Sequence, residues 1–151
     1  MPFGYRATYR SNMTTAAKAS TLASLVRTEG RNMILDLKTF VPAKDFKASR
    51  RFYQDLGFTE NFVGADVAEF QIGDYRFLLQ NYHVAEWAGN FMMQLLCDDV
   101  TPWWERVNRA DFLERYPNIM RKAPQLQAWG LRVMFISDPS GVLWHIADRR
   151  S

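Results

Sequence analysis

The sequence predicts an α+β fold made of two similar halves, each with the element order βαβββ. Hydrophobic residues make up 48% of the 151 residues and aromatic residues 15%, which is enough to form the core of one domain. In each half, an apolar stretch precedes an amphipathic helix, and strands follow. The two helices also start alike, at Asp45-Phe46 and at Asp99-Val100. Such a repeat indicates a duplicated unit.

The first half, residues 34–82, begins with an extended stretch at 34–43. Asp45 is a good N-cap and apolar residues then recur at helical spacing, so a helix is expected at 46–56. Gly57 ends this helix, because glycine readily adopts the left-handed conformation found at helix ends. Strands are expected at 58–63, 67–72 and 76–82, with glycine-containing turns between them.

The second half, residues 90–148, repeats this order and begins with an apolar run at 90–97. Thr101 is expected to cap a helix with Pro102 at its first position, where a missing N–H group removes no helical hydrogen bond. Strands are expected at 131–136 and 142–147, joined by a type I turn at 138–141. The inner face of the helix is expected at Trp103, Val107 and Ala110.

Residues 1–33 differ in charge from the rest of the chain, which carries +3 in total. This segment holds five basic residues and one acidic residue, whereas residues 34–151 hold 14 basic and 15 acidic residues. We interpret residues 1–33 as an N-terminal extension to a domain at 34–151. Three explanations stay open for this segment. It is a docking or exchanged arm, an over-extended start with Met33 as the true first residue, or a targeting signal.

Composition argues against several classes of function. Residues 34–151 have no basic stripe interleaved with aromatic residues, so no nucleic-acid partner is expected. No apolar run approaches the roughly 20 residues that cross a bilayer, so no membrane partner is expected. The single cysteine, Cys97, is typical of a reducing compartment, and a cytoplasmic location is expected. The acidic neighbours Asp98 and Asp99 disfavour Cys97 as a nucleophile, because they raise the pKa of its thiol.

Several stretches of the chain resemble one known superfamily. The sequence FKASRRFYQDLGF at 46–58 resembles the helix and following corner of the glyoxalase/bleomycin-resistance/dioxygenase superfamily, also called vicinal oxygen chelate proteins. DPSGVLWHI at 138–146 resembles its closing hairpin. The likeness is greatest to bleomycin-resistance proteins, which carry a Trp-Gly pair, as at Trp129-Gly130, and an aromatic residue four positions after LGF, as at Phe62. Over residues 34–148 this resemblance implies curled mixed sheets around a cleft, completed in a homodimer.

The resemblance also implies where the metal ligands of the superfamily's enzymes would lie. These positions fall near Lys38 and Gln80 in the first half, and at or near Met92 and on His145 in the second. Only His145 is a good ligand for a divalent ion, because lysine must first lose a proton and methionine suits few hard ions. A divalent site needs three or more ligands. We therefore expect no metal, no cofactor and no catalytic residue, with a metal-dependent lyase, isomerase or dioxygenase as the alternative.

His145 alternates with Trp144 and Ile146 along an expected strand, so its side chain points to the opposite face of the sheet. That face is the cleft if Trp144 faces the helices. Three roles stay open for His145: a structural histidine, a contact to the ligand, and a general base.

The resemblance implies a ligand site with flat aromatic surfaces. Phe62 and Trp129 match the positions that sandwich the planar part of the drug in bleomycin-resistance proteins, although ordinary packing would also explain both residues. We expect a homodimeric protein that sequesters a planar aromatic compound without changing it. Because residues 34–151 are nearly neutral, long-range attraction of a cationic drug is not favoured, and a neutral or anionic ligand is equally compatible. The expected ligand-binding residues are Lys38, Phe62, Trp87, Trp129, Gly130 and His145.

Overall fold

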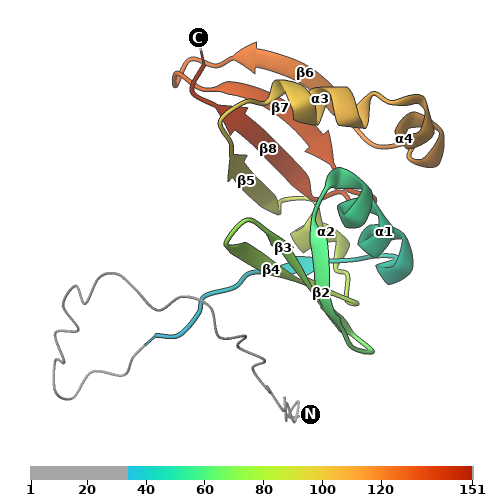
Figure 1. Ribbon diagram of the computed structural model, residues 1–151. Helices are drawn as coiled ribbons and strands as arrows, with labels where there is room; N and C mark the ends of the chain where they lie inside the picture. The colour runs from blue at the N-terminus through green and yellow to red at the C-terminus, as the bar shows by residue number, and fades with distance from the viewer. Residues whose placement is uncertain (1–33, 151) are drawn as a thin grey trace, which may run out of the picture. The chain divides into compact units, whose positions relative to one another are not determined.

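The computed structural model describes residues 34–150 (Figure 1). The three explanations for residues 1–33 therefore lie outside the described residues. No helix within 34–150 is long and apolar enough to cross a membrane. The elements in chain order are β1 (Phe40–Pro42), α1 (Phe46–Leu56), β2 (Thr59–Val63), β3 (Val67–Ile72), β4 (Tyr75–Gln80), α2 (Ala85–Ala88), β5 (Met92–Leu96), α3 (Thr101–Val107), α4 (Ala110–Arg115), β6 (Arg121–Leu126), β7 (Arg132–Ser137) and β8 (Leu143–Asp148).

The strands form two four-stranded sheets with the same internal order. The N-terminal sheet has the order β1-β4-β3-β2, and the C-terminal sheet has the order β5-β8-β7-β6. In both sheets the first strand pairs in parallel with the last, and the remaining pairs are antiparallel. The predicted α+β fold of two βαβββ modules with mixed sheets is confirmed.

Helix α1 begins and ends at the residues that the sequence predicts. The Asp45 side chain accepts a hydrogen bond from the Ala48 N–H at 2.9 Å, which caps the first turn. Gly57 adopts φ 112°, and its N–H donates to the Tyr53 and Gln54 carbonyls. The buried face of the helix is formed by Ser49, Phe52, Tyr53 and Leu56.

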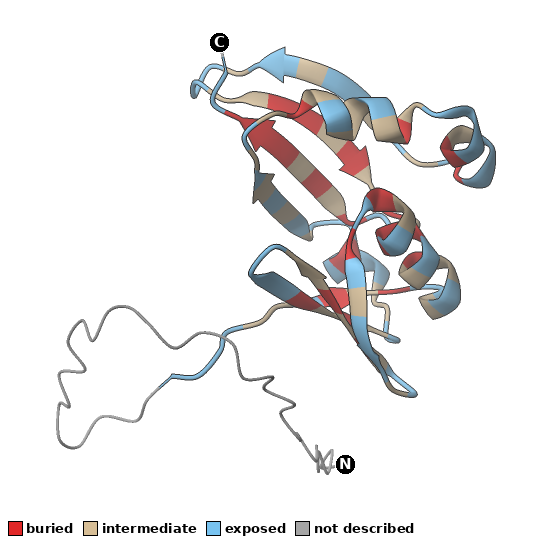
Figure 2. Cartoon of the chain, viewed as in Figure 1, coloured by how far each residue is buried: buried red, intermediate tan, exposed pale blue. Residues whose placement is uncertain are grey.

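The core is shared by both halves of the chain. Tyr53 of α1 lies among rings of the N-terminal sheet, with centroid distances of 5.5 Å to Phe70 and 4.9 Å to Phe77. Trp144 of β8 joins the same cluster, 5.8 Å from Tyr53 and 5.7 Å from Phe77. Figure 2 shows buried residues along the central strands of both sheets and on the inner side of α1. Because aromatic rings from both halves interlock, the halves stabilise each other.

A buried polar contact also joins the halves. The Tyr53 hydroxyl donates to Oδ2 of Asp138 at 2.7 Å, and Oδ1 of Asp138 accepts from the Ser140 and Val142 N–H groups. The Gly141 N–H donates to the Asp138 carbonyl at 3.1 Å, which confirms the predicted turn at 138–141. Burial raises the pKa of Asp138, and the hydrogen bonds that it accepts oppose this rise. Burial also raises the pKa of Tyr53, so this side chain stays a neutral donor.

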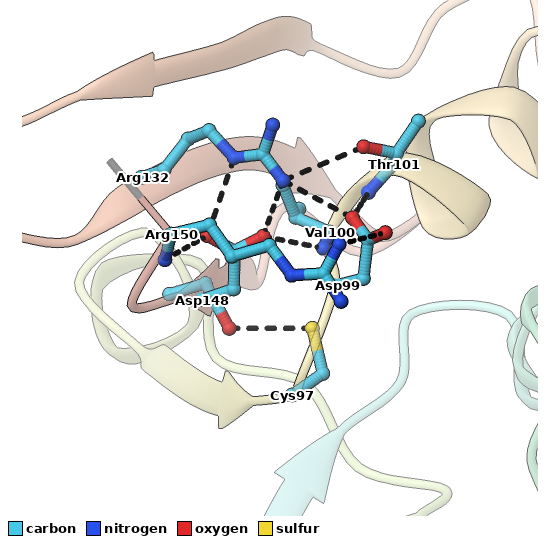
Figure 3. Close-up of polar contacts among 8 residues, drawn as sticks. Cys97, Asp99, Val100, Thr101, Arg132, Asp148 and Arg150 are labelled. Carbon is cyan, nitrogen blue, oxygen red and sulfur yellow. Dashed lines mark hydrogen bonds and ion pairs between the residues drawn. The ribbon is translucent and has the colours of Figure 1, made fainter.

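A cluster of charged side chains holds the start of α3 against the C-terminal strand (Figure 3). Asp148 is buried, accepts from the Val100 N–H at 2.7 Å, and lies 2.6 Å from Nη2 of Arg132. Oδ1 of Asp99 accepts from the Thr101 N–H at 2.9 Å and from the same Arg132 nitrogen at 3.1 Å. Hydrogen bonding from Arg132 lowers the pKa of Asp148 to about 2. Both carboxylates therefore cap α3 in their charged forms.

In the first half, the first strand is shorter than the extended stretch that contains it. The extended stretch at 34–43 contains only a three-residue strand, β1, and the exposed residues Ile34, Leu35 and Leu37 precede it outside any sheet. The link between the halves also contains a short helix, α2, which four residues were too few to predict.

Two expectations for the second half are wrong, and one strand of that half was not located. Thr101 is the first helical residue, and the neighbouring carboxylates of Asp99 and Asp148 act as the cap in its place. The expected single helix is divided into α3 and α4, so Ala110 begins a new helix and is exposed. Strand β6 was not predicted, because its six residues are mostly exposed and include Pro124. It pairs with β7 along an outer edge of the sheet, with an irregular register between Lys122 and Gln125.

Candidate functional site

Each sheet has one face that packs on the core and an opposite face that points away from it. In the N-terminal sheet, Phe70 and Phe77 point toward α1. Their neighbours point the other way and form a row across all four strands, which we call the open face of this sheet: Phe40, Leu78, Glu69 and Phe62. Phe40 is 48% exposed and Phe62 is 55% exposed. Phe62, predicted to contact ligand, is therefore accessible.

Charged residues lie in the middle of this open face. Nζ of Lys38 is 3.2 Å from Oε2 of Glu69 and also pairs with Asp36. Hydrogen bonding to Asp36 and Glu69 raises the pKa of Lys38, so its amine remains protonated. Lys38 precedes β1 instead of lying on it. A protonated lysine held by two carboxylates cannot ligate a metal, but it fixes the position of Glu69 one strand away from Phe62.

A hollow of about 220 Å³, the α2 hollow, lies beside the open face of the N-terminal sheet. Phe40 of β1 and Gln80 of β4 line one side of it. Tyr82, Trp87 and Phe91, from the link between the halves, line the other. Trp87, predicted to contact ligand, therefore lies beside this sheet and is 69% exposed.

The C-terminal sheet has an equivalent open face, formed by the row Lys122, Phe135, His145 and Gln94. Trp144 and Ile146, on either side of His145, are buried on the core side. The His145 ring packs edge-on against Phe135 at a centroid distance of 4.7 Å, and it makes no hydrogen bond within residues 34–150. His145 therefore points away from the core, as the alternation predicted.

Trp129 and Gly130 lie in the turn between β6 and β7. Gly130 adopts φ 85°, and its N–H donates to the Gln127 carbonyl at 2.9 Å. Because this positive φ favours glycine, Gly130 shapes the turn that presents Trp129, whose side chain is 59% exposed. In the described part of the chain no ring contact joins Trp129 to Phe62, and neither residue lines the α2 hollow. One chain therefore does not bring the two predicted stacking residues together.

The metal positions implied by the sequence lack a ligand set. The register places Gln94 beside His145, and Met92 lies beside Leu143. Gln80 lines the α2 hollow. Within residues 34–150, no group of three or more histidine, cysteine, aspartate or glutamate side chains could hold a metal ion. Cys97 lies elsewhere: its thiol donates to the Ala147 carbonyl, and burial raises its pKa, which disfavours the thiolate.

Sequence reasoning missed a larger hollow of about 450 Å³, which we call the strand-edge hollow. It lies between the β3–β4 hairpin and the edge strand β5, which face each other in Figure 1. Phe58, Phe77 and Trp144 form its floor, and Arg76 is the one charged residue among those that line it. Each of these rings had only the pattern of a core residue, and only tertiary contacts bring them to one hollow. The one feature of the sequence that could have indicated this hollow is Arg76, an arginine next to a buried aromatic residue.

The sequence at residues 35–146 matches the family described as the Glyoxalase/Bleomycin resistance protein/Dioxygenase superfamily. A bleomycin resistance protein of Klebsiella pneumoniae is 30% identical over 112 residues, which cover 68% of this chain and 83% of that protein. Among solved structures, a bleomycin-binding protein complexed with bleomycin is 28% identical and has a TM-score of 0.61, covering 76% of this chain and 98% of that one.

A bleomycin resistance determinant encoded on the transposon Tn5 is 27% identical, with a TM-score of 0.60 and coverage of 77% of this chain and 99% of that chain. The family match covers more than half of the chain, and these structures share its fold over about three quarters of its length. The chain belongs to the glyoxalase/bleomycin resistance protein/dioxygenase superfamily.

Proposed function

We propose that this protein binds and sequesters a planar aromatic compound, such as an antibiotic of the bleomycin type, without catalysing a reaction. The similarity to bleomycin-resistance and bleomycin-binding proteins supports a binding or resistance role. The observation that carries the proposal is that Phe62 and Trp129 are both more than half exposed, at the positions where the resemblance implies stacking on a ligand. Exposed flat rings provide stacking surfaces.

The proposed binding site is completed by a second copy of the chain. Phe62 and Trp129 belong to different modules and make no ring contact, so a symmetric dimer would place Phe62 of one protomer opposite the partner's Trp129. Strands β1 and β5 each have one unpaired edge in their sheets. Exposed apolar residues beside these edges support an interface; they are Phe40 and Met92.

The remaining predicted residues receive roles in this proposal. Trp87 borders the site from the α2 hollow, and His145 contacts the ligand from the open face of the C-terminal sheet. Lys38 keeps Glu69 in place beside Phe62, and Gly130 holds the turn that carries Trp129. The single cysteine supports a cytoplasmic location as part of the proposal.

Fluorescence titration with bleomycin and with a neutral planar compound tests this function. Phe62→Ala and Trp129→Ala are each expected to weaken binding about tenfold, because each removes a stacking surface and its buried area. Met120→Ala is the control and is expected to leave affinity unchanged, since Met120 is also an exposed apolar side chain but lines neither hollow. Unchanged affinity in both alanine variants for every compound that binds would contradict the proposed site. Sedimentation of the unmodified protein tests the dimer.

A further inference from the structure

The strand-edge hollow is a cavity that the proposed function does not use. We propose that it binds a small amphipathic anion, in which a carboxylate or sulfonate group is attached to an aromatic or aliphatic body. Its volume of about 450 Å³ lies in the range of small-molecule sites. None of the six predicted ligand-binding residues lines it, so the inference rests on different residues from the proposed function.

The floor of the hollow is apolar and already formed. Phe58 lies 5.4 Å from Phe77 and 5.5 Å from Trp144, measured between ring centroids, and each ring is at most 6% exposed. The indole N–H of Trp144 donates to the Tyr53 hydroxyl inside the core, at 3.2 Å. This donor is therefore already used, and the floor presents only ring surface to a ligand. A rigid apolar floor needs no ordering when a ligand binds.

The wall formed by β5 is also apolar. Met93 and Leu95 are half-buried against the core, and Leu96 is 50% exposed at the opening. Methionine fits irregular shapes because its side chain is unbranched and flexible. Floor and wall together favour an aromatic or aliphatic ligand body, whose burial releases water from apolar surface.

Arg76 supplies the charge at the opening. Its Nε donates to Oε1 of Gln71 at 3.2 Å and lies 4.0 Å from Oε1 of Glu69. Its two terminal nitrogens have no hydrogen-bond partner within residues 34–150. A guanidinium held through Nε presents these terminal N–H groups as a fork, which matches the two oxygens of a carboxylate or sulfonate.

Two neutral polar side chains lie at the same opening. Tyr75 and Gln94 are among the lining residues, and neither side chain has a hydrogen-bond partner in the part of the chain that the structure describes. Both groups can donate to an anion that also contacts Arg76. The lining contains no acidic residue that would repel such a ligand. Charge and hydrogen-bond donors at the opening thus match an anionic head group above an apolar floor.

Calorimetric titration of the full-length protein with 2-naphthoate and with its neutral counterpart 2-naphthamide tests the inference. Naphthoate is expected to bind saturably, and about tenfold more tightly than naphthamide, because only the anion gains a charged hydrogen bond to Arg76. Arg76→Gln is expected to remove this preference, and Arg76→Lys to keep part of it. Leu96→Trp, which fills the opening from an exposed position, is expected to abolish binding of both compounds.

The inference is overturned if naphthoate does not bind at millimolar concentration, if both compounds bind equally, or if Arg76→Gln leaves the preference intact. A combined Phe62→Ala and Trp129→Ala variant separates the two sites. If that variant loses naphthoate binding, the probe occupies the proposed sheet-face site and the strand-edge site is wrong. If Leu96→Trp dissociates a dimer, and the unmodified protein does not bind naphthoate, the hollow is an interface between two copies. The inference is then also wrong.

Discussion

The hydroxyl of Tyr53 donates to the Asp138 carboxylate at 2.7 Å and accepts from the indole N–H of Trp144 at 3.2 Å. One side chain of the first half thus satisfies two buried polar groups of the second half. Buried polar groups that lose their partners are strongly destabilising, because they have already lost their contacts with water. This contact therefore makes the fold of each half depend on the other.

Tyr53→Phe is expected to lower the free energy of unfolding by about 1–3 kcal/mol, because the buried Asp138 and Trp144 groups each lose a partner. Chemical denaturation measures this change. Tyr116→Phe is the control, since the Tyr116 hydroxyl donates to Asp55 in a partly exposed position where Arg115 also binds that carboxylate. A larger loss in Tyr116→Phe than in Tyr53→Phe would argue against the role assigned to Tyr53.

Asp148→Asn is expected to change the pH dependence of stability. The folded protein lowers the pKa of Asp148 from 3.8 to about 2, so the charged carboxylate stabilises the fold fully above pH 4 and this contribution is lost as the pH falls toward 2. The difference in unfolding free energy between the unmodified protein and the variant should therefore be largest above pH 4 and shrink below it. Comparing the two proteins cancels the contributions that other groups make to the pH dependence of stability. One of these groups is Asp138, whose raised pKa acts in the opposite direction.

Denaturation at several pH values between 2 and 7 measures this difference. Asp111→Asn is the matched control, because Asp111 pairs with Arg109 at the exposed start of α4 and its loss should matter little. A difference for Asp148→Asn that stays constant down to pH 2 would show that its charge does not stabilise the fold.

Gly57→Ala is expected to destabilise the protein by about 1–2 kcal/mol or more, as measured by thermal or chemical unfolding. Gly57 adopts φ 112°, and an added Cβ would lie 2.0 Å from Nη1 of Arg106. That nitrogen donates to the Leu56 carbonyl at 2.7 Å and would have to move. Gly73→Ala is the control, since Gly73 also has a positive φ but no atom lies near the added Cβ. Equal effects of the two substitutions would contradict the predicted clash.

Treatment with EDTA is expected to change neither the melting temperature nor ligand binding, because residues 34–150 contain no set of three metal-ligating side chains of the usual types. Added zinc or manganese should likewise give no increase in melting temperature. Thermal denaturation with and without each reagent measures both effects. A rise of several degrees on adding one equivalent of metal would favour the metal-dependent alternative.

The sequence predicted the elements whose ends are marked by local chemistry. Asp45 and Gly57 define α1, and Asp138 with Gly141 defines the turn before β8, since these residues act on their own neighbours. Strand β6 has no such signal: it is exposed, and only pairing with β7 makes it a strand. The same reason explains why Ala110 was misplaced, because the break between α3 and α4 has no glycine or proline to mark it.

The sequence predicted which face of a strand a side chain of the candidate site would lie on. It did not predict which side chains would contact one another. Alternation along the strand placed His145 on the face away from Trp144, which needs only the geometry of a strand. The pairing of Lys38 with Glu69 depends on register across strands, which no local pattern sets. The strand-edge hollow depends on two segments from different halves, with Arg76 on one and Gln94 on the other.

The position of Trp144 ties the two similar halves of the chain together. Although β8 belongs to the second repeat, its indole completes the ring cluster of the first. A gene fragment encoding residues 34–82 would lack that ring, and a fragment encoding 90–148 would expose it to water. We therefore expect the two halves to unfold together, and each half to be less stable when it is expressed by itself.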